Sequence, residues 1–121
     1  MFDSLEVLRM SQAFATHAGT RQHAIARNIA NADTPGYQAR DAVPFAEYFQ
    51  RLRDTRANGG LPRSSEAFIR PDAAPASRSP DGNTVALDHE MMRGVEARQQ
   101  HELALGIYSM ARDMLRSSIG R

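Results

Sequence analysis

The residues in this sequence that could do chemistry are its histidines, because two of the four are followed by a glutamate. His89-Glu90 and His101-Glu102 each resemble the start of the zinc-binding pattern His-Glu-x-x-His. That pattern needs a second histidine one helical turn later, so that both rings reach the metal from one face. Arginine and leucine stand at those positions, so neither pair predicts a zinc site.

The other two histidines, His17 and His23, are six residues apart and therefore face different sides of a helix. No acid pair, no Ser/His/Asp arrangement and no phosphate-binding glycine loop stands out elsewhere in the sequence. We interpret the histidines as solvated or interface residues, and we expect no enzyme activity, no metal and no cofactor. A metalloenzyme is the alternative, which zinc analysis of the purified protein would test.

The composition excludes several classes of chemistry and of partner. All 15 basic residues are arginines, so the chain has no lysine for a P-loop or a Schiff base. Cysteine is absent, which excludes a thiol nucleophile, a disulfide and a thiolate zinc site. A net charge of +1 gives no drive toward nucleic acid. No stretch is long and apolar enough to span a membrane, and the N-terminus lacks the features of a cleavable signal, so export would need a dedicated route.

Residues 3 to about 32 predict one long amphipathic helix. Asp3 is expected to cap its start, and Phe2 is expected to pack against Val7 across that cap. The apolar stripe of this helix steps by three and four residues, which suits a helix lying against another helix. The stripe consists of Leu5, Leu8, Gln12, Ala15, Ala18, Gln22, Ile25, Ile29 and Ala32.

Residues 88 to about 118 predict a second long helix with the same periodicity. Asp88 is expected to be its N-cap, and Gly120 stands where a helix end favours glycine. The apolar stripe of this helix consists of Met92, Val95, Gln99, Leu103, Ile107, Met110 and Met114.

Together these elements predict a mainly α fold, in which two long terminal helices pack as a coiled-coil-like pair and form one domain. We expect residues 1–33 to be the N-terminal helix, 34–53 a turn and short aromatic helix, 54–83 an irregular Pro/Gly/Ser-rich segment, and 84–121 the C-terminal helix. Two helices cannot cover both apolar stripes, so the surplus predicts neighbouring subunits. Unassembled, the helices would be partly disordered, because exposed stripes do not offset the entropy lost on ordering.

Three short segments predict turns. Thr34-Pro35-Gly36-Tyr37 is typical of a type II turn, because proline presets φ at the first central position and glycine supplies the positive φ at the second. Asn31, at the end of the preceding helix, suits the left-handed conformation. Asn58-Gly59 and Asp81-Gly82 could each close a hairpin.

Residues 26–37 resemble the N-terminal signature of bacterial flagellar rod and hook proteins. The residues that carry this resemblance are Asn28, Ile29, Ala30, Asn31, Thr34, Pro35, Gly36 and Tyr37. A second segment, residues 81–85, and the helix end at residues 114–119 are similar to the end of the proximal rod protein of this family, and the short chain suits that member. The resemblance implies a structural subunit of the basal-body rod, part of the drive shaft that links the MS ring to the distal rod and hook and is required for motility.

The resemblance also implies partners and a location. The partners would be other copies of the chain, the rod and junction proteins FliE, FlgC and FlgF, the MS ring and the flagellar type III export gate, with no nucleic acid and no membrane span. The subunit would reach the periplasmic rod through that gate without signal cleavage. Phe45 and Phe49 resemble the ends of a Phe-x-x-x-hydrophobic motif that the gate recognises. The alternatives are an FlgC-type rod protein and a helical adaptor or export chaperone, which would have no reason to carry the turn signature.

Overall fold

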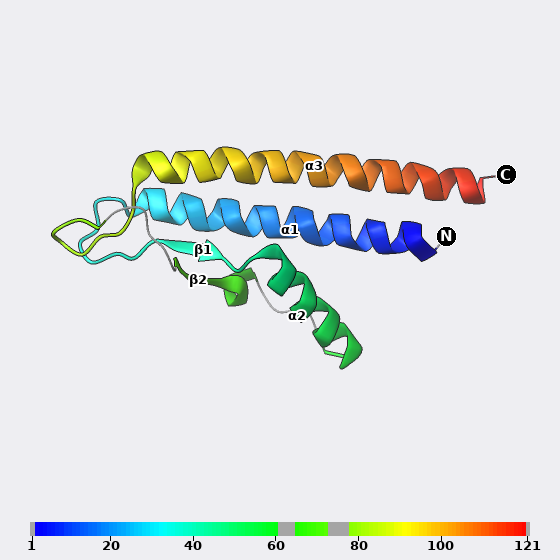
Figure 1. The fold of residues 1–121 in the computed structure, drawn as a ribbon, viewed down its shortest axis with the longest axis horizontal. Coiled ribbons are helices and arrows are strands. Elements are labelled where there is room, and N and C mark those ends of the chain that lie inside the picture. Colours follow the sequence, from blue (N-terminus) through cyan, green and yellow to red (C-terminus); the bar gives the residue numbers. More distant parts are fainter. Residues whose placement is uncertain (1, 61–64, 73–77, 121) are drawn as a thin grey trace.

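The computed structural model describes residues 2–60, 65–72 and 78–120 of the 121-residue chain. In chain order its elements are helix α1 (Phe2–Ala30), strand β1 (Arg40–Ala42), helix α2 (Phe45–Ala57), the 3-10 helix η1 (Ser65–Phe68), strand β2 (Ile69–Pro71) and helix α3 (Leu87–Ile119). The long helices α1 and α3 run antiparallel side by side, and both chain ends lie at the same end of the pair (Figure 1). The predicted mainly helical fold with two packed terminal helices is confirmed.

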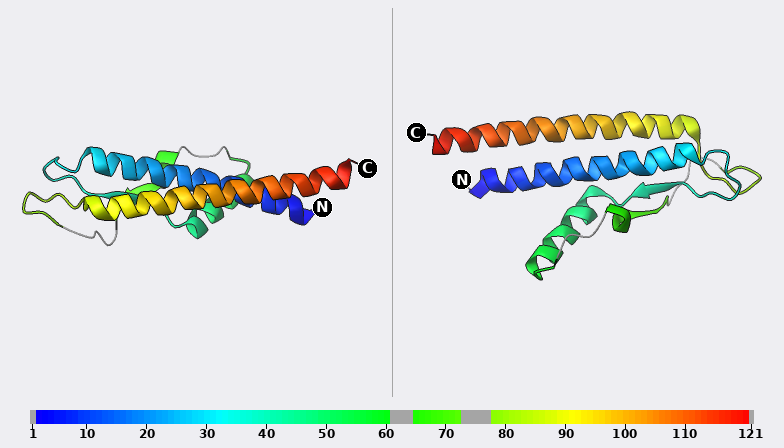
Figure 2. Two further views of the ribbon diagram at one scale, coloured as in Figure 1. Left: turned by 90° about the horizontal axis from the view of Figure 1, so that it is seen from above. Right: turned by 180° about the vertical axis from the view of Figure 1, so that it is seen from behind.

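Helix α1 is the middle layer of the molecule. One side of it packs on α3, and the opposite side carries the β1–β2 ribbon and α2 (Figures 1 and 2). The two strands pair antiparallel, with Ala42 opposite Ile69. A small hydrophobic core lies between α1 and this outer unit, which we define as β1, α2, η1 and β2. The core consists of Ala13, Val43, Tyr48 and Phe68, with Phe45, Phe49 and Leu52 packed against it.

Small side chains line the contact between α1 and α3. On α3, Ala97, Ala104 and Ala111 are buried at intervals of seven residues, and on α1 the buried Ala18 and Ile25 have the same spacing. A seven-residue repeat keeps one face of each helix against its partner, as in a coiled coil. Alanine at these positions lets the two backbones approach closely, so the contact depends on small side chains rather than on large ones.

The large apolar side chains of α3 therefore face elsewhere. Five members of its predicted stripe, Met92, Val95, Leu103, Met110 and Met114, are each more than half exposed. At 100° per residue they fall within one sector of about 100°, which lies roughly 60–180° around the helix from the alanines that contact α1. We call these five residues the α3 face. On α1 the stripe is divided, since Ala18 and Ile25 are buried whereas Leu5 and Ile29 are exposed.

The helix starts differ from the predicted ones. Helix α3 begins at Leu87, its N-cap is Ala86, and that cap makes no side-chain hydrogen bond. The prediction of Asp88 as N-cap is wrong: Asp88 lies in the first turn, where a carboxylate is favoured by the helix dipole, and its Oδ1 accepts a hydrogen bond from the backbone N–H of His89 at 2.9 Å. Asp3 likewise lies inside the first turn of α1 rather than before it. The expected packing of Phe2 on Val7 involves a side chain outside the described part of the structure.

Regular structure extends into the segment expected to be irregular. Helix α2 continues to Ala57, and β2 forms within residues 54–83 by pairing with β1. Asn58-Gly59 does not close a hairpin. Gly59 has φ +71° and its N–H donates to Arg56 O, while Gly60 N–H donates to Thr55 O, which together make the Schellman motif that ends a helix. The polar composition of residues 54–83 did not predict the end of α2 or strand β2, because each depends on contacts with residues far away in the sequence.

Candidate assembly site at the helix junction

The signature turn adopts the predicted geometry at the end of α1. Gly36 has φ +75°, and the backbone N–H of Tyr37 donates to Thr34 O at 3.2 Å. Proline at the first central position and glycine with positive φ at the second are the features of a type II turn. The turn therefore reverses the chain directly after the first helix and sends it back along α1 toward β1.

Asn31 closes the helix by another route than the one predicted. Among the described residues only glycines have positive φ, so the expected left-handed conformation of Asn31 is wrong. Its side-chain amide instead donates to Arg27 O at 2.8 Å, and its Oδ1 accepts a hydrogen bond from Thr34 Oγ1 at 3.2 Å. The side chain thus adds a second hydrogen bond to the Arg27 carbonyl, which also accepts the backbone N–H of Asn31 at 3.1 Å, and it holds the first residue of the turn.

A second turn lies against the first. Gly82, with φ +87°, follows Pro80-Asp81 in a turn closed by Gly82 N–H donating to Ser79 O at 2.9 Å, so Asp81-Gly82 does reverse the chain as predicted. Gly36 N–H donates across to Asp81 O at 3.0 Å. A Cβ at Gly82 would lie 3.5 Å from the Cα of Gly36, so the two glycines bring the backbones of the two turns into contact.

Asn83 joins the second turn to the first and was missed as a functional residue by the sequence analysis. It is 2 % exposed, and its Nδ2 lies 3.0 Å from Asn31 O, 3.0 Å from Ala32 O and 2.8 Å from Thr34 O. Its Oδ1 accepts a hydrogen bond from Val85 N–H at 2.8 Å. One buried amide therefore holds the carbonyls after α1 on one side and the approach to α3 on the other.

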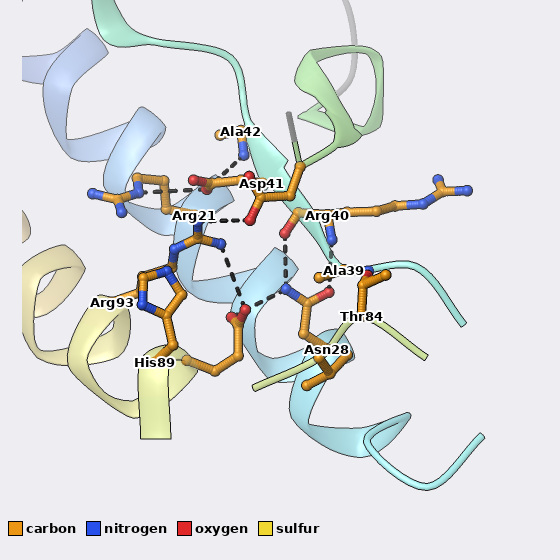
Figure 3. A network of polar contacts seen from close by, with 12 residues as sticks. Arg21, Asn28, Ala39, Arg40, Asp41, Ala42, Thr84, His89 and Arg93 are labelled. Atoms are coloured by element: carbon orange, nitrogen blue, oxygen red, sulfur yellow. Dashed lines mark hydrogen bonds and ion pairs between the residues drawn. The ribbon is translucent and has the colours of Figure 1, made fainter. Parts of the chain in front are cut away.

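Asn28, one helical turn before Asn31, also joins several elements through its buried amide (Figure 3). It is fully buried, its Nδ2 donates to Arg40 O at 2.8 Å and to Glu90 Oε2 at 3.1 Å, and its Oδ1 accepts hydrogen bonds from Arg40 N–H at 3.0 Å and from Tyr37 Oη at 3.1 Å. All the hydrogen-bonding capacity of this amide is used, as burial demands. Asn28 thus ties α1 to the turn, to β1 and to α3.

The acid that Asn28 contacts belongs to a buried charge network. Glu90 is 1 % exposed, and its Oε1 lies 3.5 Å from Arg93 Nη1, while Arg93 Nη2 contacts Asp72 at 2.6 Å. Burial opposes the charge on Arg93, but the hydrogen bond to Asp72 and its negative charge outweigh burial, so the pKa of Arg93 is raised. This network connects α3 to the segment after β2, and the arginine remains charged inside it.

Arg21 makes a second connection farther along α1. Its Nε lies 3.5 Å from Asp41 Oδ1 on β1, its Nη2 lies 3.8 Å from Glu96 Oε2 on α3, and its Nη1 donates to Gln100 Oε1 at 3.0 Å. The guanidinium thus bridges three elements in a largely buried position. A lone arginine on a helix gives no sequence signal for such a role, because its partners come from distant segments.

The two phenylalanines of the expected export motif lie in the interface between α1 and α2. Phe45 meets Phe14 edge-on with ring centroids 5.0 Å apart and stacks on Phe49 at 5.6 Å. The guanidinium of Arg53 covers Phe49 at 4.6 Å from the ring centroid. Both rings are half-buried, so each contributes to holding α2 on α1.

The α3 face continues into an apolar groove at the open end of the helix pair. Val7 on α1 and Ile107, Met110 and Met114 on α3 line this groove, which has a volume of about 230 Å³. Contiguous exposed apolar surface of this kind marks interaction sites in soluble proteins. The groove residues belong to the beginning of α1 and the end of α3. These helix ends lie together at the end of the pair that is far from the two turns (Figure 1).

The histidines do not gather into a site. Within residues 2–60, 65–72 and 78–120, no three His, Cys, Asp or Glu side chains lie close enough together to hold a metal ion. The histidines were expected to be solvated or to lie in an interface; His17 is not solvated, because it is 5 % exposed between α1 and α2 and its Nε2 lies 2.6 Å from Val43 O. None of the described helices is both long and apolar enough to cross a membrane.

Comparison with known proteins identifies relatives that cover most of the chain. Residues 16–38, which include Asn28 and the first turn, match a family model described as flagella basal body rod protein. The chain is 36 % identical over 124 residues to the flagellar basal body rod protein FlgB of Escherichia coli K12, with 90 % of each chain covered. It is 34 % identical over 123 residues to FlgB of Salmonella typhimurium LT2, with 88 % of each covered, and 38 % identical over 106 residues to FlgB of Yersinia ruckeri, with 74 % of this chain and 77 % of that relative covered.

Proposed function

Because this chain belongs to the family of flagellar basal-body rod proteins named FlgB, it is a structural subunit of the proximal rod, and we propose that it assembles by burying the α3 face against neighbouring subunits. The observation that supports this proposal is that α3 has two different faces. Its alanines pack on α1 and its large apolar residues are left exposed. A subunit that presents different surfaces to its two neighbours forms an open helical assembly, as a rod requires, when the rotation between subunits does not close into a ring.

The junction built by Asn28 and Asn83 gives the subunit its rigidity. Torque passes along a rod only if each subunit keeps its shape, and here buried hydrogen bonds fix both helices to the turns that join them. We assign the family signature residues this positioning role. The residues form no reacting group, and the arrangement supports a structural task.

The neighbours proposed for this subunit are other copies of itself, the junction protein FliE and the MS ring on one side, and FlgC or FlgF on the other. The periplasmic rod is the proposed location, reached through the flagellar type III export gate without signal cleavage. What supports these partners is the family, since rod proteins assemble with other components of the basal body.

A complementation experiment tests the proposed assembly surface. Deletion of the gene should leave MS rings without rod or hook in electron micrographs of basal bodies, and the intact gene should restore both. The double variant Val95→Asp and Leu103→Asp should be exported but fail to restore the rod, because two carboxylates on the α3 face cannot be buried unpaired.

The matched control is Gln50→Glu, which adds a negative charge at an exposed position of the outer unit and should restore motility. Complete rods formed by the double variant would contradict the assigned surface. Complete rods in the deletion strain itself would contradict the function.

The export motif has a separate test. Phe45→Ala should reduce secretion if the gate recognises this ring, and secretion can be followed by immunoblot of the exported fraction. The control is Phe14→Ala, which removes the partner ring at 5.0 Å but lies outside the motif. Equal losses in both variants would show that lost packing, and not lost recognition, is the cause.

A further inference from the structure

His17 occupies an unusual position at the contact between α1 and α2. The ring is 5 % exposed and lies among the rings of Phe45, at 5.6 Å, and Tyr48, at 5.5 Å. Its Nε2 lies 2.6 Å from the carbonyl oxygen of Val43, one residue before the turn into α2. A carbonyl can only accept, so Nε2 carries the proton and the neutral ring must leave Nδ1 unprotonated.

The other ring nitrogen is buried with no partner. Nδ1 of His17 has almost no access to solvent and makes no hydrogen bond with any described residue. In the neutral ring this costs only an unused acceptor. Protonation would create an N–H donor with a positive charge in an apolar pocket, where an unsatisfied charged group is much more costly.

The charged groups around the pocket do not compensate for such a charge. Arg21, one helical turn along α1, repels it, whereas Asp41 on β1 attracts it but is already held by Arg21 at 3.5 Å and by the N–H of Ala42 at 2.8 Å. On the other elements, Glu47 of α2 pairs with Arg70 of β2 at 3.3 Å. Tyr48, whose ring lies against that of His17, stays neutral, because burial raises the pKa of its hydroxyl.

We propose that His17 is a pH-sensitive latch that holds α2 against α1 only while its imidazole is neutral. On protonation α2 would swing away about the junction at Val43, and water would reach Nδ1. Strand β1 would stay on α1, because Asn28 holds the backbone of Arg40 independently of the histidine. The latch therefore controls the position of α2 while β1 and α3 stay on α1.

The sign of the pH effect follows from the same contacts. Burial, as the largest influence, lowers the pKa of His17, the hydrogen bond to Val43 raises it, Arg21 lowers it and Asp41 raises it, and the net pKa lies below the ordinary value of 6.5. A pKa that is lower in the folded than in the unfolded chain gives stability that is present above about pH 6.5 and lost as pH falls through the folded-state value. Acid should thus open the latch.

Two spin labels would test the latch in the full-length chain. The protein has no native cysteine, so cysteines replacing Gln22 on α1 and Gln50 on α2, both exposed, can be labelled selectively. The distance between the labels, measured by double electron–electron resonance, should be single and short at pH 7.5. At pH 5.0 it should lengthen and broaden.

His17→Gln is the informative variant, because its amide can still donate to Val43 O but does not titrate in this range. It should keep the short distance at both pH values, whereas the control His23→Gln, on the exposed side of the same helix, should respond to pH as the unmodified chain does. A pH response that survives in His17→Gln would overturn the proposal. If that variant lacks the short distance at pH 7.5, the NMR titration of His17 in the unmodified chain decides, and a midpoint at or above the ordinary value of 6.5 would overturn the latch.

Discussion

The side chain of Asn28 pairs with the backbone of Arg40 as a neighbouring strand residue would, donating to its carbonyl oxygen at 2.8 Å and accepting from its N–H at 3.0 Å. Helix α1 thereby holds β1 by one amide group. The second proton of that amide is directed to Glu90 on α3 at 3.1 Å, so one residue fixes three elements (Figure 3). This residue belongs to the family signature, and its contacts explain what the signature does in the fold.

Replacing Asn28 by alanine should be strongly destabilising. The change leaves the peptide groups of Arg40 and the buried carboxylate of Glu90 with fewer partners, which should lower the free energy of unfolding by about 2–4 kcal/mol. Urea denaturation followed by circular dichroism measures this difference. The control Gln22→Ala, at an exposed position of the same helix, should change stability by less than about 0.5 kcal/mol.

Asn83→Ala should loosen the contact between the two turns more than it affects the helix pair. The variant loses the donor to three carbonyls and the acceptor for Val85 N–H, so about 1–3 kcal/mol of local stability should disappear. Hydrogen exchange at the amides of Thr34, Gly36 and Val85 should accelerate, while exchange in the middle of α3 should change less. Equal acceleration throughout the chain would contradict this local role.

Two glycines in open space should respond in opposite directions to alanine. Neither Gly36 nor Gly19 has any atom within 4 Å of where a Cβ would lie, so only backbone conformation decides the outcome. Gly36→Ala should destabilise by about 1–2 kcal/mol, because φ is +75° there. Gly19→Ala, in the interior of α1, should stabilise by about 0.5–1 kcal/mol. Thermal denaturation of both variants checks the pair, and the same sign in both would contradict the turn geometry.

Enlarging a buried alanine of α3 should separate the helices. Ala104 is fully buried against α1, so Ala104→Leu should overpack the interface and cost about 1–3 kcal/mol. The control Glu102→Leu adds the same side chain at an exposed position and should have little effect on the folded subunit. Chemical denaturation of the two variants would reveal whether α1 and α3 approach through small residues, since similar stabilities would argue against it.

The helices and the first turn could be predicted from the sequence because their signals are local. The periodicity of the apolar residues predicts α1 and α3, and the pair Pro35-Gly36 favours a type II turn. What could not be predicted was the face that α3 turns toward α1. Periodicity identifies where large apolar residues gather, but Ala104 and its equivalents pack closest because they are small.

The polar residues of the junction were beyond sequence reasoning for a different reason. Asn28 was recognised only as part of a pattern, and Glu90 only as half of a failed zinc motif. The partners of these two residues lie up to 62 residues away, so the local sequence does not indicate that their side chains are buried and hydrogen-bonded. For Asn31 the sequence predicted a role at the helix end, but its side chain rather than its backbone conformation ends the helix.

The accessibility of the α3 face in isolated basal bodies is the most direct test of whether this face is buried on assembly. Single cysteines replacing Met92 or Leu103 should react with a maleimide in the secreted subunit but be protected in intact rods, and denaturing the rods should restore the reaction. Protection in the rod would show that this face is buried on assembly. Equal labelling of free and assembled subunits at both positions would contradict it and place the subunit contacts elsewhere.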